Sequence, residues 1–409
     1  MYENMAILAL FVFVYSLAGG RLARSPINGA IIFTAFGLAL GPLGFGFLKL
    51  NADAEQIRLL AELTLALVLF TDAANSNLGV LRAHASLPAR LLLIGLPLTL
   101  LLGFGVGVVV FDGLPLLELA ILATMLAPTD AALGKAVVTN ESVPPGIREG
   151  LNQESGLNDG ICVPVLLLIL AMAAQPGGHG VSRMALELVA GQIGVGVVVG
   201  LALTVVAAWL FKQFNQLGWI SDSWRQLPVP ALAVACFALA QWLGGSGFIA
   251  AFTGGLLFGW LARARKHTLL LAAEGTGDTL ALITWVVFGA VVIARAAEHI
   301  TWPIVLYAAL SLTLIRMLPV FLALAGLGLN TKEKLFIGWF GPRGLASIVF
   351  GVIVLDAHLP GGVTLVATVV CTILLSIVAH GLSASPLSAA LRKKVVVEEP
   401  PNGWERART

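Results

Sequence analysis

The chain has 409 residues, of which 58% are hydrophobic and 11% are charged, whereas soluble globular proteins have roughly 25% charged residues. This composition excludes an ordinary soluble enzyme. The net charge of +2 is small and the basic residues are spread along the chain, so no nucleic-acid partner is indicated. Cys162, Cys236 and Cys371 lie in separate apolar runs, which gives neither a disulfide framework nor metal-ligand spacing, and we interpret them as packing residues.

Apolar runs long enough to cross a bilayer account for most of the chain, since each spanning helix needs about 20 mostly apolar residues. The runs and their breakers predict thirteen membrane spans. They centre on about residues 4–20, 26–41, 56–74, 88–111, 115–139, 148–173, 184–211, 227–243, 246–262, 276–294, 301–328, 334–355 and 361–383. The first run lacks the basic start and cleavage site of a signal peptide, so we expect it to remain as a helix.

The distribution of Lys and Arg predicts the orientation, because cytoplasmic loops carry the excess of these residues. With the N-terminus outside and the C-terminus in the cytoplasm, 18 of the 24 basic residues fall inside and four fall outside. An error of one helix would make the downstream loops change sides and remove this asymmetry. The polar residues 395–409 are expected to form a disordered tail.

Six charged residues fall deep within the predicted spans, where a charge costs at least about 2.5–3.5 kcal/mol and is therefore a functional candidate. They are Asp72 in span 3, Asp130 in span 5, Glu154 and Asp159 in span 6, Arg316 in span 11 and Arg343 in span 12. Four more acidic residues lie nearer to predicted helix ends, where snorkelling or capping explains them. These are Glu62, Glu118, Glu187 and Asp278.

Span 5 contains the sequence Ala127-Pro128-Thr129-Asp130. A proline in mid-membrane removes one backbone hydrogen bond and clashes with a carbonyl one turn earlier. The polar backbone groups that this frees must be satisfied by protein, water or a ligand. We therefore expect an interrupted helix with a carboxylate at the break.

Span 6 places five polar side chains between Gln153 and Asp159 of an otherwise apolar helix. Ser155 and Asp159 lie about 40° apart on one helix face, whereas Glu154 is about 140° from Asp159. Ser155 and Asp159 can thus offer hard oxygen ligands to one small alkali cation. Glu154 needs a different partner, for which a cation such as arginine is the natural choice.

Span 12 repeats the interruption with Gly341-Pro342-Arg343-Gly344. If span 7 links two six-helix halves, each interrupted helix is the fifth of its half. Broken helices at matching places are typical of transporters built from inverted repeats, with the binding site between the breaks. Pro and Gly are also common in membrane helices in general, but two breaks in register beside charged residues favour the transporter.

With these motifs the sequence resembles the monovalent cation:proton antiporter superfamily, in particular its electroneutral sodium/proton exchanger branch. The resemblance covers nearly the whole chain in helix number and order. It rests on Thr129-Asp130, on the Glu-Ser-x-x-Asn-Asp of residues 154–159, on Arg316 and on the Gly-x-Arg-Gly of residues 341–344. The family usually places a proline after the Thr-Asp pair, whereas Pro128 precedes it here.

The resemblance implies that Asp159 is the carboxylate that carries the cation and the proton in turn. Asp130, Ser155 and the backbone of Thr129 would complete the shell around a Na⁺ or K⁺ ion. Asn158 stands where the electrogenic branch has a second aspartate, which implies a one-for-one exchange.

Four further residues are implied to support this site. Glu154 and Arg316 match a structural ion pair between spans 6 and 11. Arg343 belongs to the second break, and Asp72 loosely matches an acidic position of the third helix.

The resemblance also implies two domains and a homodimer, with no cofactor. Spans 4–6 (86–175) and 11–13 (300–385) would form a core bundle in which spans 5 and 12 cross. Spans 1–3 (1–80) and 8–10 (226–295) would form the dimerisation domain, with span 7 (183–212) as a linker and 386–409 as a cytoplasmic tail. The expected location is the plasma membrane.

The function predicted from these observations is exchange of Na⁺ or Li⁺ for H⁺ across the bilayer, in the service of pH homeostasis. A K⁺/H⁺ exchanger is the alternative, because the residue types do not distinguish Na⁺ from K⁺. From other classes, Asp130 and Asp159 could form the acid/base pair of an intramembrane hydrolase, although no protease motif surrounds them. A channel or receptor is a further alternative and would show no obligatory coupling.

Overall fold

The computed structural model describes residues 2–22, 29–48, 54–76, 86–173, 183–221, 224–263 and 266–391, and all regular structure in these ranges is helical. The predicted disordered tail, 395–409, lies outside the described residues. The helices are α1 (Tyr2–Leu22), α2 (Gly29–Leu40), α3 (Ala54–Asn75), α5 (Ser86–Arg90), η1 (Leu91–Gly95), α6 (Leu96–Val110), α7 (Leu116–Met125), α8 (Ala131–Val138), α9 (Pro145–Ala173), α10 (Arg183–Gln216), α11 (Pro228–Trp242), α12 (Gly247–Leu261), α13 (Lys266–Val287), η2 (Phe288–Val292), α14 (Ile293–Ala297), α15 (Trp302–Leu312), α16 (Leu314–Ala323), α17 (Thr331–Trp339), α18 (Leu345–Asp356) and α19 (Gly362–Ala390).

Within the described residues these helices form thirteen spans, as the apolar runs predict. Five spans are composite, namely α5–η1–α6, α7–α8, α13–η2–α14, α15–α16 and α17–α18. By length and composition, seven helices of the described chain are apolar and long enough to cross a membrane. Of the remaining spans, two are interrupted (α7–α8 and α17–α18) and three are helices of 12 to 15 residues (α2, α11 and α12). The sixth, α3, contains four charged residues, Glu55, Arg58, Glu62 and Asp72.

The two interruptions at Pro128 and Pro342 are present. In the fifth span, α7 ends at Met125 and α8 begins at Ala131. In the twelfth, α17 ends at Trp339 and α18 begins at Leu345. Each break leaves about one turn of non-helical backbone inside the membrane span, and such backbone is tolerated where protein surrounds it.

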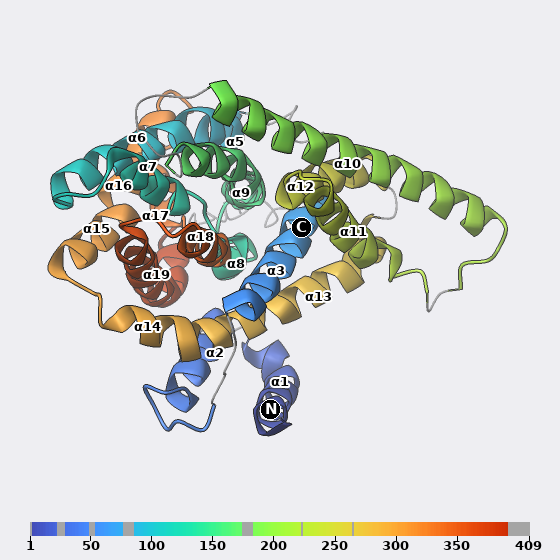
Figure 1. The fold of residues 1–409 in the computed structure, drawn as a ribbon, viewed down its shortest axis with the longest axis horizontal. Coiled ribbons are helices and arrows are strands. Elements are labelled where there is room, and N and C mark those ends of the chain that lie inside the picture. The colour runs from blue at the N-terminus through green and yellow to red at the C-terminus, as the bar shows by residue number, and fades with distance from the viewer. Residues whose placement is uncertain are drawn as a thin grey trace, which may run out of the picture.

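The helices pack in two groups (Figure 1). In one group, α6, α7, α9, α16, α18 and α19 are neighbours, with α8 against α9 and α19 and with α17 against α16. In the other, α3 packs against α11, α12 and α13, and α2 packs against α13 and η2. The groups meet where α3 contacts α9 and α18 and where α14 contacts α19, while α10 joins α12 and α11 to α9.

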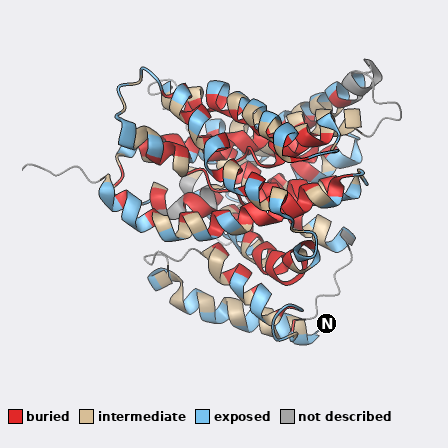
Figure 2. Ribbon diagram, turned by 90° about the vertical axis from the view of Figure 1, so that its left-hand side faces the viewer, coloured by how far each residue is buried: buried red, intermediate tan, exposed pale blue. Residues whose placement is uncertain are grey.

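Many residues on the outer faces of the helices are exposed (Figure 2), and large apolar residues are among them. The N-terminal helix α1 has no buried residue although it is strongly apolar. Exposed tryptophans lie near span ends, as expected for side chains at a membrane interface. They are Trp209, Trp219, Trp224, Trp242, Trp260 and Trp302. Such a surface is stable against lipid and not against water.

Candidate functional site

The two broken spans cross and are hydrogen-bonded to each other at their breaks. The backbone N–H of Asp130 donates to the carbonyl of Pro342 over 2.8 Å. The hydroxyl of Ser347, in the first turn of α18, donates to the carbonyl of Met125 at the end of α7 over 2.7 Å. Each break therefore satisfies backbone groups that the other has freed.

The carboxylate of Asp130 lies between the N-termini of two half-helices. Its Oδ1 accepts the N–H of Leu133 in α8 at 2.9 Å, and its Oδ2 accepts the N–H of Leu345 at the start of α18 at 2.7 Å. Both helix dipoles present their positive ends to this anion, which favours its ionised form. A Cβ on Gly344 would lie 2.0 Å from Oδ2, so this contact requires glycine.

Three neutral side chains link α9 to the first break. Asn158 Nδ2 donates to the hydroxyl of Thr129 over 2.7 Å, and this hydroxyl lies 2.9 Å from that of Ser155. All three side chains are buried. They form a short row of oxygens beside the break, within one helical turn of Asp159 along α9.

Asp159 is 7% exposed, and its Oδ1 has no hydrogen-bond partner among the described residues. Asp130 and Asp72 both lie close enough to repel a negative charge on it. α3 lies against α9 here, since the Cβ of Asp72 is 3.5 Å from the position that a Cβ on Gly156 would take. An unpaired carboxylate in such a position needs a proton or a cation to compensate its charge.

The described residues contain no group of three or more His, Cys, Asp or Glu side chains arranged to hold a metal ion. The neutral oxygens near Asp159 are the hydroxyls of Thr129 and Ser155, while the nearby carboxylate of Asp130 accepts two backbone N–H groups. Hydroxyl and carboxylate oxygens are hard ligands that a small alkali cation accepts.

The structure contains the ion pair between Glu154 and Arg316. Arg316 Nη1 donates to Oε1 at 2.6 Å and Nη2 donates to Oε2 at 2.7 Å, which makes the pair bidentate. Both residues are 1% exposed. Gly341 gives room for the guanidinium, because a Cβ there would lie 2.5 Å from Arg316 Nε. The pair joins α9 to α16, and α16 passes the second break.

Arg343 is fully buried in the second break. Its Nη1 donates to the carbonyl of Gly341 at 2.9 Å, whereas its Nε and Nη2 have no partner among the described residues. Its backbone N–H donates to the hydroxyl of Ser376 in α19 at 2.8 Å.

Two residues that the sequence analysis missed, Ser376 and His380 of α19, complete the second break. Ser376 accepts from Arg343 as described, and His380 Nε2 lies 2.8 Å from the carbonyl of Trp339, the last residue of α17. The signal was available in the sequence, because two polar residues four apart share one face of an apolar helix. Without a known neighbour, however, that face could not be assigned to the break.

The acidic residues near helix ends have local partners. Glu62 forms an ion pair with Arg58 one turn earlier at 2.7 Å. Glu118 accepts the N–H of Gly361 at the start of α19 at 2.9 Å. Glu118 therefore caps a helix, as predicted, whereas Glu62 is held by an ion pair within its own helix that the prediction did not include. The three cysteines are buried and free.

Comparisons with known proteins agree with this geometry. Residues 7–390 match the sequence model of the sodium/hydrogen exchanger transmembrane family. The K(+)/H(+) antiporter NhaP2 of Shewanella sp. strain ANA-3 is 25% identical over 395 residues, which cover 96% of this chain and 67% of that protein. The K(+)/H(+) antiporter NhaP of Alkalimonas amylolytica is 24% identical over 98% of this chain and 69% of its own length.

A similar fold is known from a solved structure. The sodium proton antiporter MjNhaP1 of Methanocaldococcus jannaschii, in the structure at pH 8, superimposes with a TM-score of 0.74. The match covers 93% of this chain and 99% of that one, at 21% sequence identity. The two proteins thus share the fold. At 21% identity, this similarity does not extend to the transported ion.

Proposed function

The chain belongs to the sodium/hydrogen exchanger family, and on this premise we propose that it exchanges Na⁺ or Li⁺ for H⁺ at a single site centred on Asp159. It is a multi-pass membrane cation/proton antiporter and not an enzyme, as its family and its relatives indicate. The observation that carries the proposal is the buried carboxylate of Asp159, whose Oδ1 has no hydrogen-bond partner in the described ranges, beside two crossed helix breaks.

Cation and proton transport are coupled because the site is costly to move across the membrane when it holds neither ion. An unpaired carboxylate cannot cross a low-dielectric barrier without a large desolvation penalty, whereas the protonated or cation-bound site can. Thr129 and Ser155 would add oxygens to the cation shell, and Asn158 holds Thr129 in place. Proton and cation therefore replace each other at Asp159, and each crossing moves one of them.

We propose that the exchange is electroneutral, with one proton for one cation. The supporting observation is that both oxygens of Asp130 accept backbone N–H bonds at helix N-termini, so Asp130 is held ionised throughout the cycle. Asp130 then contributes charge to the site without exchanging a proton. Asn158 cannot titrate, which leaves Asp159 as the group that changes protonation.

The antiport activity is tested with purified protein in liposomes that carry an imposed proton gradient. External Na⁺ or Li⁺ should dissipate the gradient, as measured with a pH-sensitive dye, and protein-free liposomes should show no response. Cation uptake without proton movement would identify a channel and contradict the proposal. The absence of a response to any alkali cation would also contradict it.

The stoichiometry is tested in the same vesicles under an imposed membrane potential. Because one-for-one exchange moves no net charge, clamping the potential with K⁺ and valinomycin should leave the Na⁺-driven rate unchanged. An inside-negative potential of about 100 mV is worth about 2.3 kcal/mol per net charge. It should leave the equilibrium Na⁺ distribution unchanged, whereas an exchange that moves one net charge would shift it by roughly 50-fold.

A K⁺/H⁺ exchanger is the second candidate, and the names of the bacterial relatives favour it. The oxygens around Asp159 suit either ion by their chemical type. Comparing Na⁺ and K⁺ at equal concentrations in the liposome assay distinguishes the two. For a K⁺ exchanger, the potential must be clamped with an ion other than K⁺.

We further propose a domain organisation and an orientation. The two packing groups support a core bundle of 86–175 and 300–385 and a dimerisation domain of 1–80 and 226–295, although α19 continues to Ala390. The exposed apolar surface of α1 supports contact with lipid or with a second copy in a homodimer. The asymmetry of Lys and Arg supports an external N-terminus and a cytoplasmic C-terminus in the plasma membrane.

A further inference from the structure

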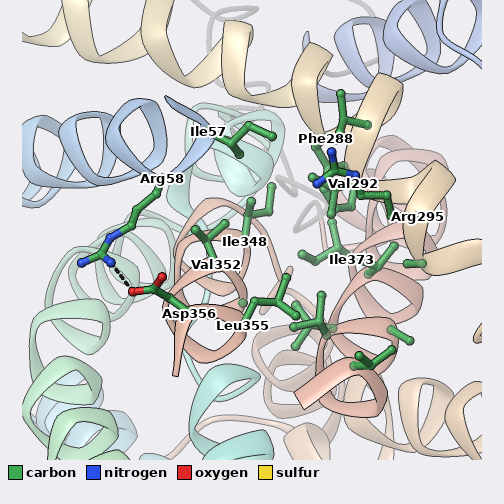
Figure 3. A pocket seen from close by; sticks show the side chains of 18 of the residues that line it. Ile57, Arg58, Phe288, Val292, Arg295, Ile348, Val352, Leu355, Asp356 and Ile373 are labelled. Atoms are coloured by element: carbon green, nitrogen blue, oxygen red, sulfur yellow. Dashed lines mark hydrogen bonds and ion pairs between the residues drawn. The ribbon is translucent and has the colours of Figure 1, made fainter. Parts of the chain in front are cut away.

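A cavity of about 680 Å³ lies between the two packing groups (Figure 3). Residues of α3, η2 and α14 form one wall, and residues of α18 and α19 form the other. Its interior is chiefly aliphatic, with Ile57, Ile348, Val352 and Ile373 among the side chains that point into it. Asp159 and its neighbours do not line it. The cavity is therefore separate from the candidate ion site.

The cavity is as deep as one leaflet of a bilayer. On α19 it extends from Val363 to Ile373, which corresponds to about 15 Å of helix. The hydrocarbon core of a bilayer is about 30 Å thick. The polar lining residues all come from helix ends at one side, with Arg58 and Asp356 on α3 and α18 and Arg295 on α14.

Of the two arginines at the mouth of the cavity, Arg58 and Arg295, only Arg58 has a partner among the residues that the structure describes. Arg58 is engaged, because it donates to Glu62 at 2.7 Å and also to Asp356. Arg295, on the opposite wall (Figure 3), has neither an ion pair nor a hydrogen bond in the described part of the chain. The exposed carboxylate of Glu55 also lines the mouth. A headgroup that carries a phosphate and an amine would complement Arg295 and Glu55.

We propose that this cavity binds one acyl chain of a membrane phospholipid whose phosphate contacts Arg295. An apolar cavity of this volume offers water too few hydrogen-bond partners, and if it were empty its walls would lose their dispersion contacts. An acyl chain supplies those contacts, and the adjacent leaflet supplies the chain. The charged residues of the mouth lie at helix ends, and the end of a membrane-spanning helix is where it meets the lipid headgroups. The proposal concerns binding alone and does not depend on which cation is transported.

The cavity is tested by filling it. Delipidated protein is mixed with phosphatidylethanolamine, and retained lipid is counted by native mass spectrometry. The unchanged protein should retain one lipid per chain at this site, and Val352→Phe should abolish that retention. Val109→Phe is the matched control, because Val109 is 82% exposed on α6, away from the cavity. Equal retention by Val352→Phe and the control would overturn the proposal.

The phosphate contact is tested at the exposed Arg295, where a substitution leaves the packing unchanged. Arg295→Glu should weaken phosphatidylethanolamine retention at least about fivefold, the contribution of one basic residue near a lipid headgroup. Lys332→Glu, an exposed reversal at the start of α17, is the control and should have no effect. If Arg295→Glu retains the phospholipid unchanged, or if oleate or detergent competes as well as the phospholipid, the assignment of a phospholipid is wrong.

Discussion

Asp159→Asn is expected to abolish cation-driven proton exchange in proteoliposomes while the protein remains folded. The amide has nearly the shape of the carboxylate but cannot carry a proton or compensate a cation. Because Oδ1 of Asp159 has no partner among the described residues, the substitution breaks no hydrogen bond at that atom. The loss should therefore appear in transport and not in stability, so the melting temperature in detergent should stay within a few degrees of that of the unchanged protein.

The matched control is Asp112→Asn, the same chemical change at an exposed carboxylate between α6 and α7. It should leave the exchange rate unchanged. Substantial exchange by Asp159→Asn would show that another group carries the proton. Asp72 would then be the next candidate, since it lies beside Gly156 of the same site.

The thirteen spans and both breaks could be predicted because their causes are local. An apolar run of sufficient length has few structures available in lipid, and a proline in its middle removes a hydrogen bond wherever the helix lies. The matching places of the breaks in the two halves then indicated a binding site between them, and the family resemblance implied that the broken spans cross. In the structure, the hydrogen bond from the N–H of Asp130 to the carbonyl of Pro342 joins the two breaks where the spans cross.

The hydrogen bond from Leu345 of α18 to Asp130 could not be predicted, because it depends on how closely α18 approaches. From the sequence, the carboxylate of Asp130 could bind a cation or accept backbone N–H groups. In the structure its two oxygens accept the N–H groups of Leu133 and Leu345. Gly344 permits this approach, because a Cβ there would collide with the carboxylate of Asp130. The need for glycine at this position is therefore evident only when Asp130 is known to be its neighbour.

The two buried arginines show a similar contrast. The partner of Arg316 could be anticipated because Glu154 faces away from Asp159 and an unpaired charge in the membrane is costly. Arg343 could not be placed in this way, since in the described residues it makes its side-chain hydrogen bond to a backbone carbonyl and to no carboxylate. Charge-pairing arguments succeed for complementary pairs and fail where the backbone is the partner.

Arg316→Ala and Glu154→Ala should each destabilise the detergent-extracted protein by about 3–5 kcal/mol, the usual result of leaving one buried charge unpaired. Each single change leaves one charged side chain, 1% exposed, without its partner, whereas the double change removes both charged side chains. The loss in the double variant, measured by thermal unfolding, should therefore be smaller than the sum of the single losses. Asp356→Ala is the control, because its pair with Arg58 is exposed (57% and 39%) and should contribute no more than about 1 kcal/mol. Additive losses at Arg316 and Glu154 would mean that the two charges do not stabilise each other, and the bidentate pair would then have no structural role.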